Sequence, residues 1–201
     1  MRSYEDRAMD FIKAIFPYIE GDMESPWFVR GGVRKFNEDF NRKVMVRSGS
    51  ARVALITSDY VVKFDYDHDA VTEIGGGENE VHLYEIAERE GFAHLFAKVT
   101  PVMWKGYNFY IMPRIYWIND DHDSAWKYMT AEESRWCKAH SLTDLHCGNF
   151  GFRNGEICIV DYGFQEALVE ECEYESEDWM SYDSTEEEEE SQNSAISYPF
   201  Q

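Results

Sequence analysis

Basic side chains are missing from the last quarter of the chain. No lysine or arginine follows Arg153, whereas residues 154–201 contain fifteen Asp or Glu residues. The formal net charge of the whole chain is −20, and most of this charge comes from that segment. Such a segment repels the phosphate backbone and cannot bind nucleic acid directly. The residues that precede it are close to balanced in charge.

Cysteines are few, and long apolar runs are lacking. The four cysteines have no spacing typical of a disulfide framework. No segment resembles a signal peptide, and none approaches the roughly 20 apolar residues of a membrane span. We therefore expect a cytoplasmic protein that does not contact a membrane. The periodic apolar positions of residues 3–19 predict a helix packed on the folded body, with Ser3 as its N-cap.

One motif places three oxygen-bearing side chains at a spacing suited to phosphoryl transfer. The segment Thr-Asp-Leu-His-Cys-Gly-Asn at 143–149 contains Asp144 and Asn149, and Asp161-Tyr162-Gly163 follows a short apolar run at 157–160. An Asp and an Asn that bracket a tight turn can direct a carboxylate at a hydroxyl and an amide oxygen at a metal ion. A second Asp can then hold Mg²⁺ against nucleotide phosphates.

At these residues the chain resembles the protein-kinase-like superfamily, in particular its phosphotransferase-like and small phage-encoded kinase-like members. The resemblance rests on D-L-H-C-G-N and D-Y-G and covers about residues 44 to 165. It implies that Asp144 is the catalytic base and that Asn149 and Asp161 bind Mg²⁺. If the protein is phage-encoded, its setting is the host cytoplasm.

The resemblance also implies which residues bind the nucleotide. Lys63, in the apolar run 61–64, is expected to grip the α- and β-phosphates, and Glu80 on a helix over 78–89 is expected to pair with it, with Glu78 as the alternative. The small-residue turn at 48–50 is expected to cover the phosphates. The expected nucleotide-binding residues are Ser48, Gly49, Ser50, Arg52, Lys63 and, where a last strand runs into a hinge, Met112.

The chain departs from the family pattern at three places. Leu142-Thr143 stands where the family has a histidine or arginine before the catalytic Asp, and Gly49 alone remains of the usual three loop glycines. Only 38 residues follow Gly163, and thirteen of them are acidic. The resemblance therefore implies an α+β, minimal bilobal protein-kinase-like fold with a truncated C-lobe.

We expect three parts. Residues 1–43 are expected to form an N-terminal helix and lead-in segment, 44–169 the minimal kinase-like domain, and 170–201 an acidic tail of disorder-like composition. Other expected elements are an extended segment at 27–29, a break at Gly31-Gly32, three strands in 44–63, a hairpin over 98–112, and short helices at 124–129 and 131–139.

These patterns predict an ATP- and Mg²⁺-dependent phosphotransferase that acts on a hydroxyl acceptor, most simply on a protein. The alternative is a catalytically inactive, kinase-like binding module that inhibits a host or partner protein through the acidic tail. Aromatic residues within that tail could anchor it on a basic partner or in the protein's own cleft; they include Trp179, Tyr182 and Phe200. By residue type alone, Cys137, His140, His146 and Cys147 form a further candidate set for zinc.

Overall fold

The computed structural model describes residues 2–49, 51–66, 76–116, 124–142 and 144–163. The chain divides into two units, Met1–Val169 and Glu170–Gln201, and all described residues lie in the first. This unit mixes helices with antiparallel strands, so the α+β class is confirmed. None of the helices in the described ranges has the length and apolar character needed to cross a membrane.

A five-stranded antiparallel sheet organises the unit. Its strands are β1 (Met45–Ser48), β2 (Arg52–Ile56), β3 (Tyr60–Asp65), β4 (Thr100–Trp104) and β5 (Tyr107–Pro113), in the order β1-β2-β3-β5-β4. The three expected strands in 44–63 and the expected hairpin are confirmed. Alternate residues of β3 point to opposite faces: Val62 and Phe64 enter one core, whereas Lys63 points to the other face.

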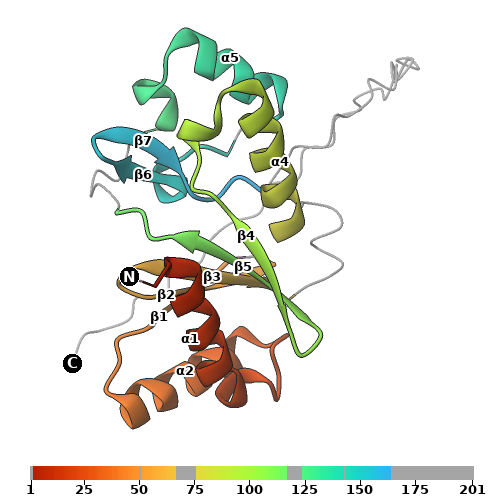
Figure 1. Cartoon of the computed structure of the whole chain (residues 1–201), viewed down its shortest axis with the longest axis vertical. Helices are drawn as coiled ribbons and strands as arrows, with labels where there is room; N and C mark the ends of the chain where they lie inside the picture. Colours follow the sequence, from red (N-terminus) through yellow and green to blue (C-terminus); the bar gives the residue numbers. More distant parts are fainter. Residues whose placement is uncertain (1, 50, 67–75, 117–123, 143, 164–201) are drawn as a thin grey trace, which may run out of the picture. The chain divides into compact units, whose positions relative to one another are not determined.

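Two helices cover the first face of this sheet (Figure 1). They are α1 (Tyr4–Ile19) and α2 (Pro26–Phe40), and their apolar sides share a core with β2, β3 and β5. Ser3 caps α1 by accepting a hydrogen bond from the Asp6 N–H at 3.1 Å, so the predicted start of this helix is confirmed. The helices α1 and α2 therefore pack into the same core as the sheet.

The predicted extended segment at 27–29 is wrong, because these residues lie in α2. The helix begins with Ser25 as N-cap and Pro26 in the first turn, a combination typical of helix starts. Gly31 and Gly32 continue the helix instead of breaking it. A Cβ at Gly32 would lie 2.1 Å from the Tyr18 carbonyl oxygen, so glycine at this position allows α2 to approach α1 closely.

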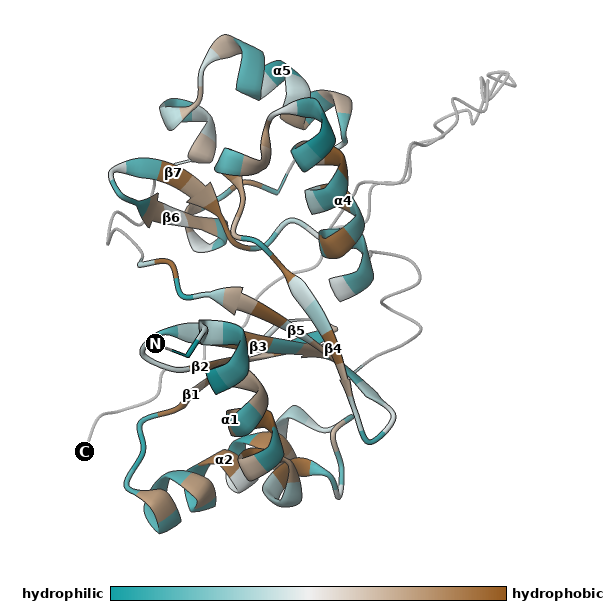
Figure 2. Cartoon of the chain, in the orientation of Figure 1, coloured by the Kyte–Doolittle hydropathy of each residue, from teal (hydrophilic) through white to brown (hydrophobic). Residues whose placement is uncertain are grey.

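The other face of the sheet meets a second set of elements (Figure 1). These are α4 (Gly77–Glu90), η1 (Ala93–Leu95), η2 (Ala125–Tyr128), α5 (Ala131–Ala139), η3 (Cys147–Asn149) and the hairpin β6 (Phe150–Arg153) and β7 (Glu156–Ile159). Their apolar residues form a second core that includes Met112. The apolar stretches of β3, β5 and β7 are visible in Figure 2.

The helices of this second set match most expectations. Gly91 ends α4 in a left-handed conformation, and Thr130 and Glu133 form a capping box at the start of α5. Residues 125–128 are a 3-10 helix rather than an α-helix. The buried stripe of α4 contains Glu80, Leu83 and Ala87, whereas Val81 and Tyr84 are only half-buried.

The close approach of α1 and α2 at Gly32 can be tested by substitution, with Gly31 as the control position. Gly32→Ala forces α1 and α2 apart and should lower the free energy of unfolding by about 1–3 kcal/mol, as overpacking does. Gly31→Ala, whose Cβ would meet nothing within 4 Å, should raise it by about 0.5–1 kcal/mol. Urea denaturation of both variants measures the difference. Equal effects at the two positions would contradict the close crossing.

Candidate functional site

Lys63 and Glu80 form an ion pair between the sheet and α4. The Nζ of Lys63 lies 2.7 Å from Oε1 of Glu80. Lys63 reaches this position because it alternates with the core residues Val62 and Phe64 along β3. Glu80 reaches it because it lies on the buried stripe of α4, and it is completely buried. The structure thus pairs Lys63 with Glu80 and leaves Glu78 exposed at the surface.

Asp161 joins this pair from the end of β7. Its Oδ1 lies 3.5 Å from the Nζ of Lys63, and Lys63 also donates to the carbonyl of Val160 at 2.8 Å. Arg52 on β2 contacts the same Oδ1 and lies 3.0 Å from Oε1 of Glu80. Two cations and two anions therefore form one neutral cluster where β2, β3, α4 and the segment after β7 meet.

The β6–β7 hairpin brings the two motifs of the sequence together. Asn149 directly precedes β6, Asp161 follows β7, and the register pairs Phe150 with Ile159. The two ends of an antiparallel pair adjoin each other. The backbone carbonyl of Asn149 accepts hydrogen bonds from the N–H groups of Val160 at 2.8 Å and Asp161 at 3.4 Å. The hairpin therefore positions Asn149 beside the Lys63–Glu80–Asp161 cluster.

Asp144 is held by Asn149 and remains accessible. The Asn149 Nδ2 donates to the backbone carbonyl of Asp144 at 2.8 Å and to its Oδ2 at 3.2 Å. His146 lies 3.6 Å from Oδ1 of Asp144 and accepts from the Gly148 N–H at 2.9 Å, which closes the turn. The Asp144 side chain is 51% exposed. Its carboxylate is thus oriented on one side and open to a substrate on the other.

The charges of the cluster set its acid–base behaviour. Burial acts to raise the pKa of Asp161, but the neighbouring Lys63 and Arg52 outweigh it and lower this pKa to about 2. Burial raises the pKa of Glu80, although the same two cations oppose the shift. Asp161 therefore stays ionised at neutral pH, as a metal ligand must be.

The predicted phosphate loop lies between β1 and β2. The Gly49 N–H donates to the Arg52 carbonyl at 2.9 Å, and the Ser48 hydroxyl accepts from Arg30 at 2.9 Å. Ser50 lies outside the described residues. Met112 is buried in the core around α4, and its strand pairs with β3 at Val61. The structure thus brings Lys63, Arg52, Glu80, Asp161, Asn149 and Asp144 together.

The donor set fits Mg²⁺ better than a structural metal. Within the described ranges, no group of three or more His, Cys, Asp and Glu side chains could hold a metal ion, and Cys137 is buried beside Met129. The candidate zinc set is therefore not assembled. Mg²⁺ commonly uses one or two protein oxygen ligands together with phosphates and water. Because the Nδ2 of Asn149 is engaged by Asp144, its Oδ1 is the atom suited to such a role, beside the Asp161 carboxylate.

Three features of the site were not foreseen from the sequence. Arg52 contacts Glu80 and Asp161 directly, in addition to any role toward phosphate. Tyr162 is buried, donates its hydroxyl to the Ala97 carbonyl at 2.6 Å and donates its N–H to Glu80 at 3.3 Å. Gly163 packs so closely that an added Cβ would lie 2.6 Å from the Gly76 carbonyl oxygen. The aromatic and the glycine of D-Y-G thereby fix Asp161 against α4.

Comparison with known proteins adds no further assignment. No protein-family model matches the chain, and no curated protein matches it. Inferences about function therefore rest on the geometry of the site.

The buried ion pair can be tested against its exposed neighbour. Glu80→Gln leaves Lys63 and Arg52 with one carboxylate between them and should lower the free energy of unfolding by about 3 kcal/mol. Glu78→Gln removes the same charge at an exposed position of the same helix and should change it by less than about 0.5 kcal/mol. Chemical denaturation measures both. Similar values for the two variants would show that the pair does not stabilise the fold.

Proposed function

We propose that this protein is a minimal ATP-dependent phosphotransferase with a bilobal, kinase-like fold. The observation that carries the proposal is the position of Lys63 between Glu80 and Asp161, beside a loop that holds Asn149 and Asp144. These residues come from four separate segments of the chain, and each carries the side chain that phosphoryl transfer requires. If Asp144 and Asn149 were only turn residues, nothing would require a buried lysine in the same cluster.

Each side chain has a role in the proposed reaction. Lys63 neutralises the α- and β-phosphates, and Glu80 holds Lys63 in position. Asn149 and Asp161 would hold Mg²⁺, which, when bound, neutralises charge on the phosphates. Asp144 orients the acceptor hydroxyl and takes its proton as the hydroxyl oxygen bonds to the γ-phosphorus and the bond to the β-phosphate oxygen breaks. A protein hydroxyl is the acceptor that we propose.

Arg52 must change partners if nucleotide binds here. It contacts Oδ1 of Asp161, an atom that the proposed metal requires. The triphosphate carries enough negative charge to attract this guanidinium away from the carboxylate, and Arg52 would then contact phosphate oxygens. Loading of the site thus exchanges one set of ion pairs for another.

The contact between Arg52 and Asp161 also favours a second function. If Arg52 does not leave Asp161, the metal ligand stays blocked, and the protein is a kinase-like binding module without chemistry. Calorimetric titration with ATP and Mg²⁺, beside an assay for ATP hydrolysis and autophosphorylation, separates the two. The enzyme binds and turns over nucleotide, whereas the module does neither.

Asp161→Asn should remove the Mg²⁺ dependence of nucleotide binding, because a neutral amide is a poorer Mg²⁺ ligand than a carboxylate. Calorimetry with ATP in Mg²⁺ and in EDTA measures this dependence. The variant should bind ATP·Mg²⁺ roughly tenfold or more weakly than wild type. Asp22→Asn, the same change at an exposed position, is the control. Unchanged Mg²⁺ dependence in Asp161→Asn would remove Asp161 from the metal site.

Asp144→Ala should separate binding from turnover. A base that acts mainly in the transition state contributes little to nucleotide affinity, and its loss lowers kcat by about 10²–10⁴-fold. Calorimetry and a turnover assay on the same preparation measure both quantities, with Asp22→Ala as control. Wild-type turnover in Asp144→Ala would exclude the catalytic role.

A further inference from the structure

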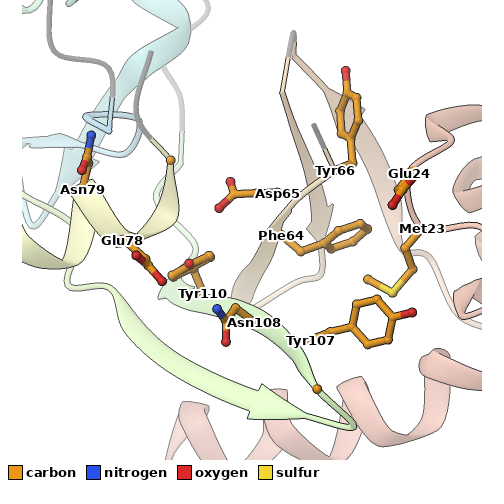
Figure 3. Close-up of a pocket in the computed structure, with 12 residues that line it drawn as sticks. Met23, Glu24, Phe64, Asp65, Tyr66, Glu78, Asn79, Tyr107, Asn108 and Tyr110 are labelled. Carbon is orange, nitrogen blue, oxygen red and sulfur yellow. The ribbon is translucent and has the colours of Figure 1, made fainter. Parts of the chain in front are cut away.

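A pocket lies where two strands of the sheet separate. β3 and β5 pair from Tyr60↔Pro113 to Lys63↔Tyr110. Beyond that point β3 stays with β2 as far as Asp65, whereas β5 stays with β4 as far as Tyr107. The resulting fork, the start of α4 and the segment before α2 enclose a pocket of about 620 Å³ (Figure 3). This volume lies within the range of pockets for small organic ligands.

The side chains around this fork pocket suit a cation. Three carboxylates line it: Asp65 at the end of β3, Glu78 at the start of α4, and Glu24 on the opposite side (Figure 3). Aromatic rings line it as well, and the electron-rich face of an aromatic ring attracts cations. They belong to Phe64, Tyr66, Tyr107 and Tyr110. Among the described lining residues there is no Lys, Arg or His.

The neighbouring cations offset these carboxylates only in part. Arg52 and Lys63 lower the pKa of Asp65, but both form their ion pairs with Glu80 and Asp161. Because that cluster is already neutral, the three carboxylates of the fork pocket add a formal charge that no other described lining residue offsets. A bound cation would supply the missing charge.

Asp65 supplies an independent indication. Its Oδ2 accepts a hydrogen bond from the Gly77 N–H at 3.2 Å, but its Oδ1 is buried, and no described residue donates a hydrogen bond to it. Buried carboxylate oxygens normally have a partner. Burial also raises the pKa of Asp65 more than the Gly77 amide, Arg52 and Lys63 lower it. A positive charge in the pocket would favour the ionised carboxylate.

We propose that the fork pocket is a binding site for a guanidinium or primary ammonium group. The two exposed carboxylates, Glu24 and Glu78, attract the cation at the entrance. Asp65 attracts the cation from the wall, and the aromatic rings cover its aliphatic stem. The cation can be a free amine or a basic side chain of a peptide. This site does not depend on the proposed phosphotransferase activity.

The test uses the full-length protein with probes that differ only in charge. N-acetyl-arginine amide should bind with a Kd on the order of 1 mM or tighter, measured by NMR titration, whereas the neutral citrulline analogue should not bind. A flexible peptide that contains one arginine forms the second arm. Equal affinity of both arginine probes indicates that a small cation suffices, and tighter binding of the peptide indicates a peptide ligand.

Charge variants locate the binding. Glu78→Gln and Asp65→Asn should each raise the Kd about fivefold or more, because each removes one carboxylate from the pocket. Glu88→Gln removes the same charge from the exposed side of α4, outside the pocket, and should leave the Kd unchanged. Circular dichroism verifies that the variants fold. If Asp65→Asn does not fold, Glu78→Gln still tests the site, because Glu78 is exposed.

Three results would overturn the proposal. The first is the absence of saturable binding by either arginine probe. The second is equal binding of the arginine and citrulline probes. The third is an equal effect of Glu88→Gln and Glu78→Gln, which would mean that the probes respond only to the overall negative charge of the protein.

Discussion

The ion pair between Lys63 and Glu80 is the interaction on which the rest of the site depends. Glu80 is completely buried, and it contacts Lys63 on β3, Arg52 on β2 and the Tyr162 N–H after β7. A buried carboxylate is costly unless it is paired, so this side chain holds all three segments against α4. The proposed catalytic groups can be rigid because the fold itself requires this contact.

The antiparallel pairing of β6 and β7 explains how Asn149, Asp161 and Asp144 come together. A hairpin of two short strands, β6 and β7, returns the chain to its starting point, so Asn149 and Asp161 lie at the same end. The Asn149 carbonyl and side chain then link Asp161 to Asp144. The sequence separation between Asn149 and Asp161 is therefore the length of one β-hairpin. The hairpin thereby places both proposed metal ligands at one end of β6 and β7.

Local patterns predicted much of this structure. The apolar run around Lys63, the cap at Ser3 and the hairpin at residues 98–112 each carry a local signal, and each is confirmed. Gly31-Gly32 misled the prediction because a glycine pair is typical of a break, whereas here Gly32 lies at a helix crossing. Such a contact depends on the distant Tyr18. The partners of Arg52 and the fork between β3 and β5 likewise depend on pairings that no short segment encodes.

The central claim is that this site transfers the γ-phosphoryl group of ATP to a hydroxyl. The most direct measurement is mass spectrometry of the protein and of candidate partner proteins after incubation with Mg²⁺ and ATP labelled with ¹⁸O in its γ-phosphate. We expect a labelled phosphate on a defined hydroxyl side chain, formed together with ADP. Bound nucleotide without any labelled phosphate on protein, or with label only in inorganic phosphate, would contradict it.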